Sequence, residues 1–415
     1  MDSLITVASL PYAIAGSFAV EPPNWEQATL KRIRRIAIHA YRKVPFYRER
    51  WQAASLSPFS LSSLEDFAHA PLIDRLDWRC APDEVIISPS SIEPLVWHRS
   101  GGSMTGQPFH YPQRLREELI MRGQAVRGML RGGGRLLRLN PLDVNKAGGA
   151  AYMGRLVNVA STASTRDRLE AVLASSAPVI SSYPSILWRV AVRALREGIS
   201  LPGTVKRIHV GGEVMTPTMQ RTIEHVFQAP VRQSYAAAEL GLLARSCEGG
   251  HLHIRPRFSY LELYDGDTRV GPGEWGEVVV TNFLSYARPA IRLRTGDRAR
   301  WGDSPCACGS ALPYLQDIAG RLSERIERPD GTMVFWPAVE NALAPYTSEI
   351  LGYQVEQTAP QSVTVRLCLD SPQGSTDRFL PALTALFKGM QVIVTPTDNF
   401  QAALSGKMSP VVGYG

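Results

Sequence analysis

Cysteine, long hydrophobic runs and the best-known catalytic motifs are all scarce in this sequence of 415 residues. The five cysteines are odd in number and three of them cluster, which makes a poor disulfide framework. No apolar run reaches the length of a transmembrane helix. The apolar residues 4–20 have no preceding Lys or Arg and contain Pro11, which argues against a signal peptide. We therefore expect a cytoplasmic protein that does not use a membrane.

The composition is otherwise that of a globular protein. Hydrophobic residues make up 44% of the chain and charged residues 20%, which is ordinary, and the length predicts two or more units. The net charge is +7, and part of the excess lies in residues 30–50, where apolar residues recur at helical spacing. That pattern favours a solvated helix face over a nucleic-acid patch.

The missing motifs narrow the interpretation of the glycine-rich segment 99–108. No Gly-Lys-Ser/Thr follows at the spacing of a P-loop, and the Gly-x-Ser-x-Gly frame of a nucleophile elbow is absent. Glycines can nevertheless bring successive N–H groups to an anion, and hydroxyls can add donors or bind a phosphate-bound Mg²⁺. An ordinary surface turn is the alternative. The candidate phosphate-binding residues are Ser100, Gly101, Gly102, Ser103, Thr105 and Gly106.

The order of the expected elements predicts an α/β fold. Residues 25–80 have a helical pattern that breaks at 44–47, and residues 115–130 resume it. Strands then alternate with helices, which is typical of a parallel α/β layer. The expected strands are 156–160, 178–181, 205–210 and 231–235, and the expected helices are 185–196 and 216–227.

The pattern becomes β-rich after residue 253, and a domain boundary is expected near residue 320. We predict a large N-terminal domain, residues 1–320, with parallel α/β layers and a β-rich subdomain. A small mobile α+β domain, residues 321–415, would follow it. The expected elements are strands at 261–264, 276–281 and 290–294, then helices at 337–344 and 379–388 with strands at 353–356, 363–369 and 392–395.

Short polar clusters at the ends of the expected strands could bind a nucleotide. Gly211-Gly212-Glu213 follows the strand at 205–210, and open α/β sheets bind nucleotides at that end of their strands. Tyr235 could stack on a base, and Glu239, four residues later, could hold Mg²⁺. Asp297 could accept hydrogen bonds from ribose hydroxyls. An ordinary strand-to-helix turn is the alternative for Gly211-Gly212-Glu213, and for Lys407, in the polar tail, a solvated surface charge is the alternative.

The segments together resemble those of the adenylate-forming ligases, and more narrowly of the phenylacetate–CoA ligase and CapK-like group. The resemblance covers nearly the whole chain and rests on the order and spacing of the motifs. "RSGGSMTGQP" is similar to the phosphate loop, "HVGGEVMTPTM" to the adenine-contacting turn and "YAAAELG" to the motif that ends in the Mg²⁺ ligand. The closest match is "VGPGEWGEVVVTNF" followed by "IRLRTGDRAR". "AGRLSERI", "FWPAVENAL" and "LSGKMS" resemble the C-terminal domain and its catalytic-lysine tail.

The resemblance implies a role for each candidate residue. The loop at 100–106 would close over the phosphates of ATP. Gly211, Gly212, Glu213 and Tyr235 would frame the adenine, Glu239 would bind Mg²⁺, and Asp297 and Arg321 would hold the ribose. Lys407 would stabilise charge at the α-phosphate while the acyl-adenylate forms, on a domain that can leave before a thiol attacks. Three departures weaken the expectation of efficient catalysis and thioester formation, namely Met104, Ala236 with Ala238, and Ser323.

The clustered cysteines predict a metal site. Cys306-Ala307-Cys308-Gly309 can present two thiolates to one ion, and Cys247 with either His251 or His253 would complete a tetrahedral Cys₃His set. Free thiols in a loop are the alternative. A closed four-ligand site has no open position, so we expect a structural Zn²⁺ that supports folding rather than catalysis.

Two functional hypotheses follow from the resemblance, and a third belongs to another class. The first is ATP-dependent activation of a carboxylic acid, aromatic by analogy, with transfer to CoA. The second changes the acceptor to a carrier-protein thiol or an amine in a biosynthetic pathway. The third is a nucleic-acid-binding protein that keeps only the scaffold. Tyr183 and His209 would line the acid pocket or serve only in packing, and a homodimer is left open.

Overall fold

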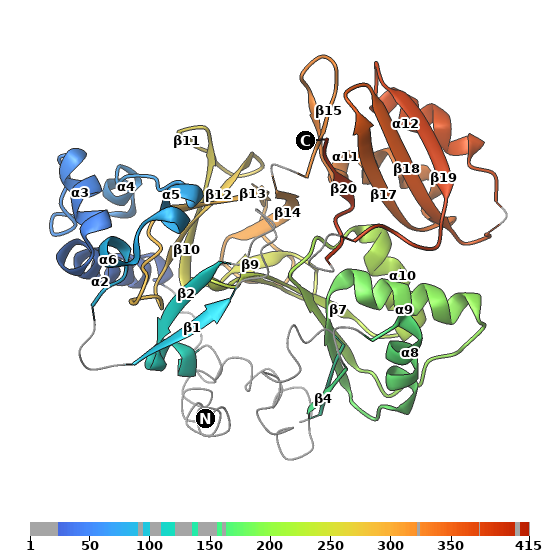
Figure 1. Ribbon diagram of the computed structural model, residues 1–415, viewed down its shortest axis with the longest axis horizontal. Helices are drawn as coiled ribbons and strands as arrows, with labels where there is room; N and C mark the ends of the chain where they lie inside the picture. The colour runs from blue at the N-terminus through green and yellow to red at the C-terminus, as the bar shows by residue number, and fades with distance from the viewer. Residues whose placement is uncertain are drawn as a thin grey trace. The chain divides into compact units, whose positions relative to one another are not determined.

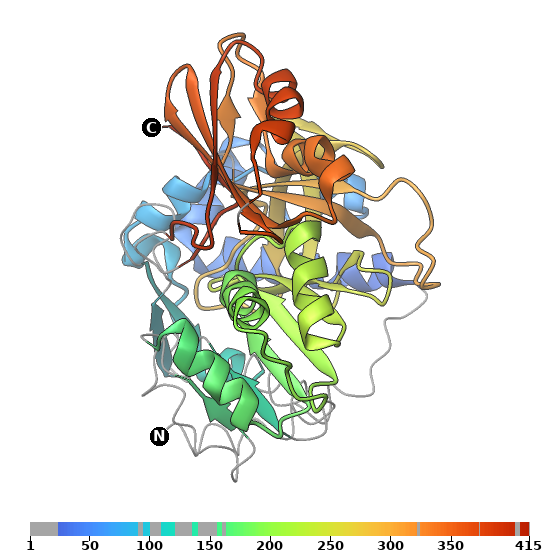
Figure 2. The ribbon, with the colours of Figure 1, turned by 90° about the vertical axis from the view of Figure 1, so that its right-hand side faces the viewer.

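The computed structural model describes residues 24–89, 94–99, 109–120, 135–139, 156–159, 163–321, 324–372, 374–402 and 407–414. The chain divides into two units. Unit 1 contains Met1–Arg131 and Ser234–Gln316, and unit 2 contains Gly132–Gln233 and Asp317–Gly415. Figures 1 and 2 show the elements of both units. No helix in the described ranges combines the length and the apolar content that crossing a membrane requires.

Unit 1 begins with helices, as the sequence predicts for residues 25–80. Pro45 disfavours helical geometry at the residue before it, so Val44 is extended and the helix breaks there. Ile33, Ile36 and Ala40 are buried at helical spacing while Arg34 and Arg35 are exposed, which confirms the solvated basic face. The helices are α2 (Trp25–Lys43), α3 (Pro45–Ala53), α4 (Leu64–Ala68), α5 (Arg75–Cys80) and α6 (Asp83–Ile86).

The strands of unit 1 are mainly antiparallel, as expected for its β-rich part. One group runs in the order β11 (Thr268–Arg269), β10 (Ser259–Asp265), β12 (Trp275–Asn282) and β13 (Leu293–Trp301). A second group runs β7 (Val231–Ala237), β8 (Gly241–Ser246), β9 (Leu252–Ile254) and β14 (Tyr314–Arg321). The division between the units falls within β7 and within β14. A separate hairpin pairs β1 (Leu95–Arg99) with β2 (His110–Arg114).

The strand predicted at 290–294 is wrong at its start, because β13 begins only at Leu293. Arg292 has a positive φ of 47°, which interrupts an extended strand. Its side chain is buried, and its guanidinium donates hydrogen bonds to Glu262 and Tyr264. The apolar pattern around Arg292 therefore reflects burial without a strand.

Unit 2 contains the parallel α/β layer that the alternating pattern predicts. Its strands run in the order β6 (Arg207–Gly211), β5 (Val179–Ser182), β3 (Leu136–Arg138) and β4 (Leu156–Asn158), and all their pairings are parallel. Leu137, Ile180 and Ile208 are almost fully buried and share one hydrophobic core with Trp188 and Ile223 of the helices. The helices are α8 (Thr165–Ala174), α9 (Pro184–Arg196) and α10 (Pro217–Phe227).

The C-terminal part of unit 2 is α+β, as predicted. Its sheet runs β19 (Gln391–Pro396), β18 (Ser362–Leu369), β17 (Ile350–Ala359) and β20 (Val411–Val412). Val339 of α11 (Trp336–Leu343) and Leu383 of α12 (Leu380–Leu386) enter the same core as Val365. Two short elements, β15 (Ile326–Glu327) and β16 (Met333–Val334), form a hairpin. The boundary at 320/321 and the mobility of residues 321–415 stay predictions.

Candidate active site and metal centre

The predicted phosphate loop joins the paired strands β1 and β2. Arg99 at the end of β1 pairs with His110 at the start of β2, so the loop is the connection of a hairpin. Ser100, Gly101, Gly102, Ser103, Thr105 and Gly106 themselves lie outside the described residues.

Tyr235 and Asp297, both in unit 1, contact each other directly. The Tyr235 hydroxyl donates a hydrogen bond of 2.7 Å to Asp297 Oδ2. Burial raises the pKa of Tyr235 well above its ordinary value, and the Asp297 carboxylate adds to that effect, so the phenol keeps its proton as a donor. The structure thus brings together two residues that the sequence assigns to the adenine and the ribose.

Glu239 is buried and forms an ion pair that sequence analysis missed. Its side chain is only 4% exposed, and the Arg75 guanidinium donates a hydrogen bond to its Oε1. Arg75 also donates to the Thr295 carbonyl at 2.5 Å, and Tyr111 donates to the Ala238 carbonyl at 2.7 Å. Arg75 and Glu239 are 164 positions apart, and no local pattern in the sequence links them.

The candidate residues of unit 2 converge on the turn after β6. Gly212 has a φ of +82°, and a Cβ added there would lie 2.9 Å from the Tyr183 ring and 3.7 Å from Lys407 Nζ. The ammonium of Lys407 lies 5.4 Å from the centroid of the Tyr183 ring, within range of a cation–π interaction. Only glycine combines this backbone conformation with such close approach. Tyr183, Gly212 and Lys407 therefore form one cluster. Their predicted roles at the acid, the adenine and the α-phosphate stay predictions.

The Glu213 carboxylate accepts three hydrogen bonds within unit 2. Oε1 accepts hydrogen bonds from the Ser185 hydroxyl at 3.0 Å and the Met408 N–H at 3.1 Å, and Oε2 accepts from the Ser185 N–H at 3.0 Å. Burial raises the pKa of Glu213, while the three donors and the nearby Lys407 oppose that rise. Ser185 and Met408 are contacts that sequence analysis did not foresee.

His209 and Arg321 occupy the positions that the sequence suggests. His209 is half-buried in β6, where it pairs in register with Ser181 of β5. Arg321 ends β14, and its backbone N–H donates to Glu324 Oε2 at 3.3 Å. Their proposed contacts with the acid and the ribose stay predictions.

Cys247, His253, Cys306 and Cys308 converge in unit 1, with their four ligand atoms all within 4.8 Å of one another. Tetrahedral zinc with three thiolates and one imidazole would place two sulfurs about 3.8 Å apart and sulfur and nitrogen about 3.6 Å apart. The Cys247 and Cys306 sulfurs are 3.7 Å apart, and Cys308 Sγ is 3.3 Å from His253 Nε2. The donor set and its spacing therefore fit zinc.

The structure also separates the two candidate histidines. His253 Nδ1 lies 2.9 Å from the Leu312 carbonyl, so its proton belongs on Nδ1 and Nε2 faces the cysteines. Such a backbone partner is typical of a metal-bound imidazole. His251 stacks on Tyr314 with ring centroids 4.5 Å apart, and its Nδ1 lies 3.3 Å from Cys306 Sγ. His253 is therefore the histidine whose free ring nitrogen joins the three sulfurs, and His251 lies beside the four residues.

Two of the curated proteins that are similar in sequence to this chain are a phenylacetate–coenzyme A ligase and CapK. The curated phenylacetate–coenzyme A ligase of Thermus thermophilus is 24% identical over 348 residues, which is 78% of this chain and 76% of that protein. Protein CapK of Staphylococcus aureus is 28% identical over 193 residues, 46% of this chain and 42% of CapK. The chain is thus similar in sequence to curated phenylacetate–CoA ligases. No protein-family profile matches it.

A solved structure confirms the fold of the chain. The crystal structure of a 2-hydroxyisobutyryl-CoA ligase in complex with an acyl-adenylate has a TM-score of 0.76 to it. The two chains are 20% identical, and the match covers 94% of this chain and 89% of the other. The chain therefore has the mixed α/β fold of that structure.

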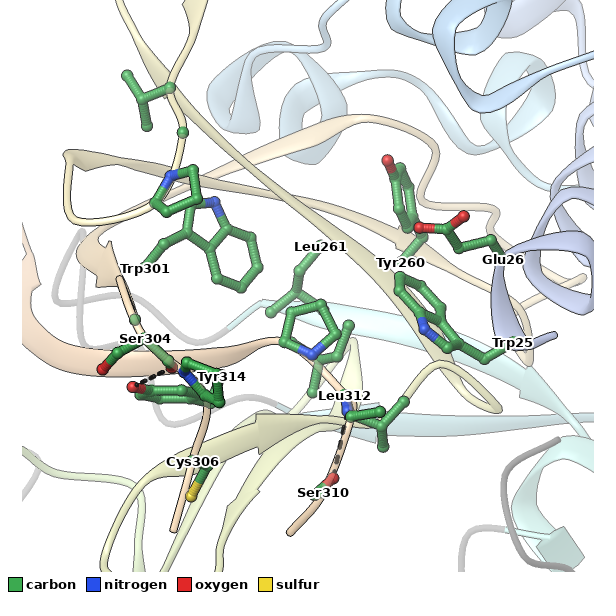
Figure 3. A pocket seen from close by; sticks show the side chains of 18 of the residues that line it. Trp25, Glu26, Tyr260, Leu261, Trp301, Ser304, Cys306, Ser310, Leu312 and Tyr314 are labelled. Atoms are coloured by element: carbon green, nitrogen blue, oxygen red, sulfur yellow. Dashed lines mark hydrogen bonds between the residues drawn. The ribbon is translucent and has the colours of Figure 1, made fainter. Parts of the chain in front are cut away.

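Unit 1 also has an apolar cavity of about 830 Å³. Figure 3 shows the rings of Trp25, Tyr260, Trp301 and Tyr314 around it. Cys306 lines the cavity and belongs to the Cys/His cluster. Neither Tyr235, Glu239 nor Asp297 lines it. The cavity is therefore distinct from the candidate nucleotide-binding residues of unit 1.

Proposed function

We propose that the chain is an AMP-forming acid–CoA ligase. In the first half-reaction the substrate carboxylate would attack the α-phosphorus of ATP and release pyrophosphate. In the second, a thiolate would attack the acyl carbonyl and release AMP. The observation that carries the proposal is Lys407: its ammonium lies beside Gly212 and Tyr183, at the end of a parallel strand where open α/β sheets bind nucleotides.

Each unit contributes side chains suited to this chemistry. Lys407 would stabilise the charge that gathers at the α-phosphate, which is often the largest single contribution to such a step. Asp297, with Tyr235 bound to it, would accept from the ribose hydroxyls, and Glu239, held by Arg75, would bind Mg²⁺. The bound metal would supply further charge stabilisation. Arg321 and His209 keep the roles that the resemblance suggests.

Pyrophosphate release tests the function. Wild-type protein is incubated with ATP, Mg²⁺ and a panel of aromatic, hydroxylated and alkyl acids, beside Lys407→Ala. Loss of a preorganised cation should lower acid-dependent release by about 10²–10³-fold. Lys388→Ala is the matched control, because Lys388 is exposed in the same unit; it should retain wild-type release. Absence of release with every acid, together with absence of ATP binding, would exclude the proposal.

The acceptor is identified in the same assay. Adding CoA, a phosphopantetheine carrier protein or an amine to the acid that gives release distinguishes thioester formation from amide formation. CoA is the acceptor that the homology supports. Transfer to a carrier protein or an amine, a cytoplasmic location and a homodimer stay predictions of the sequence.

We also propose that Cys247, His253, Cys306 and Cys308 hold a structural Zn²⁺. The four ligand atoms lie within 4.8 Å of one another, and the 3.7 Å between the Cys247 and Cys306 sulfurs is close to the separation in a tetrahedral zinc site. With four protein ligands the ion would have no position for substrate, so its contribution would be to folding.

A further inference from the structure

The segment that carries Lys407 is attached to the turn after β6 by one buried carboxylate. The N–H of Met408, the residue after the lysine, donates to Glu213 Oε1 at 3.1 Å. Glu213 is separated from Met408 by 195 positions, so this bond joins two distant parts of unit 2. This hydrogen bond, one residue after Lys407, restricts the position of the Lys407 Cα and so the region that its side chain can reach.

The same carboxylate is held rigidly from the other side. The N–H and the hydroxyl of Ser185, in the first turn of α9, donate to Oε2 and Oε1 at 3.0 Å each. All three donors therefore face one carboxylate, and a carboxylate accepts on both oxygens whereas an amide does not. Burial raises the pKa of Glu213, and Lys407 is among the groups that oppose the rise. The lysine and the carboxylate thus interact electrostatically as well.

Tyr183 and Gly212 complete the cradle for the ammonium. Tyr183 is the N-cap residue of α9, two positions before Ser185, and its ring faces Lys407 Nζ. Gly212 directly precedes Glu213 and leaves the space that the ring and the ammonium share. One short turn and the start of one helix therefore hold both the backbone and the side-chain end of the lysine segment.

From this geometry we propose that Glu213 is the positioning residue for Lys407, anchoring the lysine segment through the Met408 N–H for the adenylation step. This inference rests on the proposed function. It replaces direct adenine contact as the main task of Glu213. The resemblance predicts that residues 321–415 move between the two half-reactions; such a movement would break the anchor, so we assign the anchor to adenylation and not to thioester formation.

The test measures the two half-reactions separately in Glu213→Gln and Glu213→Ala. Adenylation is followed as pyrophosphate release, and thioester formation is started from supplied acyl-adenylate and CoA. Losing a hydrogen bond to a charged acceptor should lower the kcat of adenylation by roughly 10–100-fold. The KM for the acid and the rate of thioester formation should stay within about threefold of wild type.

Two control variants separate anchoring from general damage. Glu224→Gln changes a half-buried glutamate of the same unit. Its carboxylate accepts hydrogen bonds from the Val231 N–H at 2.8 Å and from the Gln220 side chain at 3.2 Å. Ser185→Ala removes one of the donors that hold the carboxylate but leaves the Met408 contact, so it should lower adenylation less than Glu213→Ala does. Glu224→Gln should retain adenylation within a few-fold of wild type. Melting temperatures of all variants show whether folding is intact.

A second measurement reads the anchor without any activity. Trypsin cleaves after lysine, so cleavage after Lys407, followed by mass spectrometry of the C-terminal fragment, should be several-fold faster in Glu213→Ala than in wild type or Glu224→Gln. Equal cleavage rates, an equal fall in both half-reactions, or unchanged adenylation would each overturn the anchor. If wild type itself releases no pyrophosphate with any acid, the proposed function fails, and the cleavage rates still decide the anchor.

Discussion

Loss of the proposed zinc ion should destabilise unit 1, and mutation of the exposed candidate ligand Cys308 can test this. Cys308 is exposed, whereas Cys306 is buried. Replacing Cys308 with serine therefore removes a ligand without placing a polar group in the core or opening a cavity. Any large fall in stability of Cys308→Ser then reports the loss of the metal rather than a packing defect.

The expected magnitude follows from linkage. A ligand present at about 1,000 times its Kd stabilises the folded state by about 4 kcal/mol. For a domain of 150–250 residues, each kcal/mol shifts the melting temperature by about 2–4 °C. Cys308→Ser, or wild type treated with a strong zinc chelator, should therefore melt roughly 8–16 °C lower, and added Zn²⁺ should restore only the wild type.

The assay combines metal content with thermal unfolding. Purified wild type should contain one zinc per chain by elemental analysis, and Cys308→Ser should contain much less. Cys80→Ser is the matched control, because Cys80 is also exposed and lies outside the cluster. His253→Asn should lose the metal, while His251→Asn should keep it, since His253 Nε2 faces the cysteines.

Two results would refute this reasoning. Wild type without bound zinc, and with no rise in melting temperature on adding Zn²⁺, would mean that the cluster is a group of free thiols. Full metal content in His253→Asn together with loss in His251→Asn would mean that the ligand assignment is reversed.

Three further perturbations test other parts of the structure. Arg75→Ala leaves the buried Glu239 carboxylate without its ion-pair partner and should lower the free energy of unfolding by about 3–5 kcal/mol, measured with urea; a loss below 1 kcal/mol would contradict this. Gly212→Ala adds a Cβ at positive φ against the Tyr183 ring and should reduce pyrophosphate release at least tenfold; unchanged release would show that the turn adapts. Burial raises the pKa of Glu117 to about 7, so the folded state keeps a proton that the unfolded state loses near pH 4.5. Stability should therefore fall by about 1–3 kcal/mol as the pH rises from 4.5 to 7, and Glu117→Gln should abolish that slope in pH-dependent denaturation.

Local chemistry in the sequence determined most of the secondary structure. The helix break at Val44 follows from Pro45, and the alternation of apolar segments places β5, α9, β6 and α10 close to their observed positions. The α+β pattern of the last 90 or so residues was equally readable, because each strand and helix there has a regular apolar face. The strand prediction failed at residues 290–292, which are buried without forming a strand.

The sequence also determined which residues could carry the chemistry. Lys407 and the Gly211-Gly212-Glu213 turn were recognisable through the order of motifs that resembles the adenylate-forming ligases, since each alone has an ordinary structural alternative. The three cysteines with a histidine were recognisable from their ligand chemistry and their clustering in the sequence. Their convergence is a property of the tertiary structure. The choice of His253 over His251 depends on the Leu312 carbonyl, which orients one imidazole toward the sulfurs.

Only the tertiary structure decided the contacts that hold these groups in place. Arg75 reaches Glu239 across 164 positions, and Glu213 reaches Met408 across 195. Pairs so far apart in the sequence do not alter its apolar periodicity, because each residue fits its own helix or turn regardless of which residue it contacts in the fold. Burial then makes such pairs strong, because a charged or polar group removed from water must find its partner in the fold.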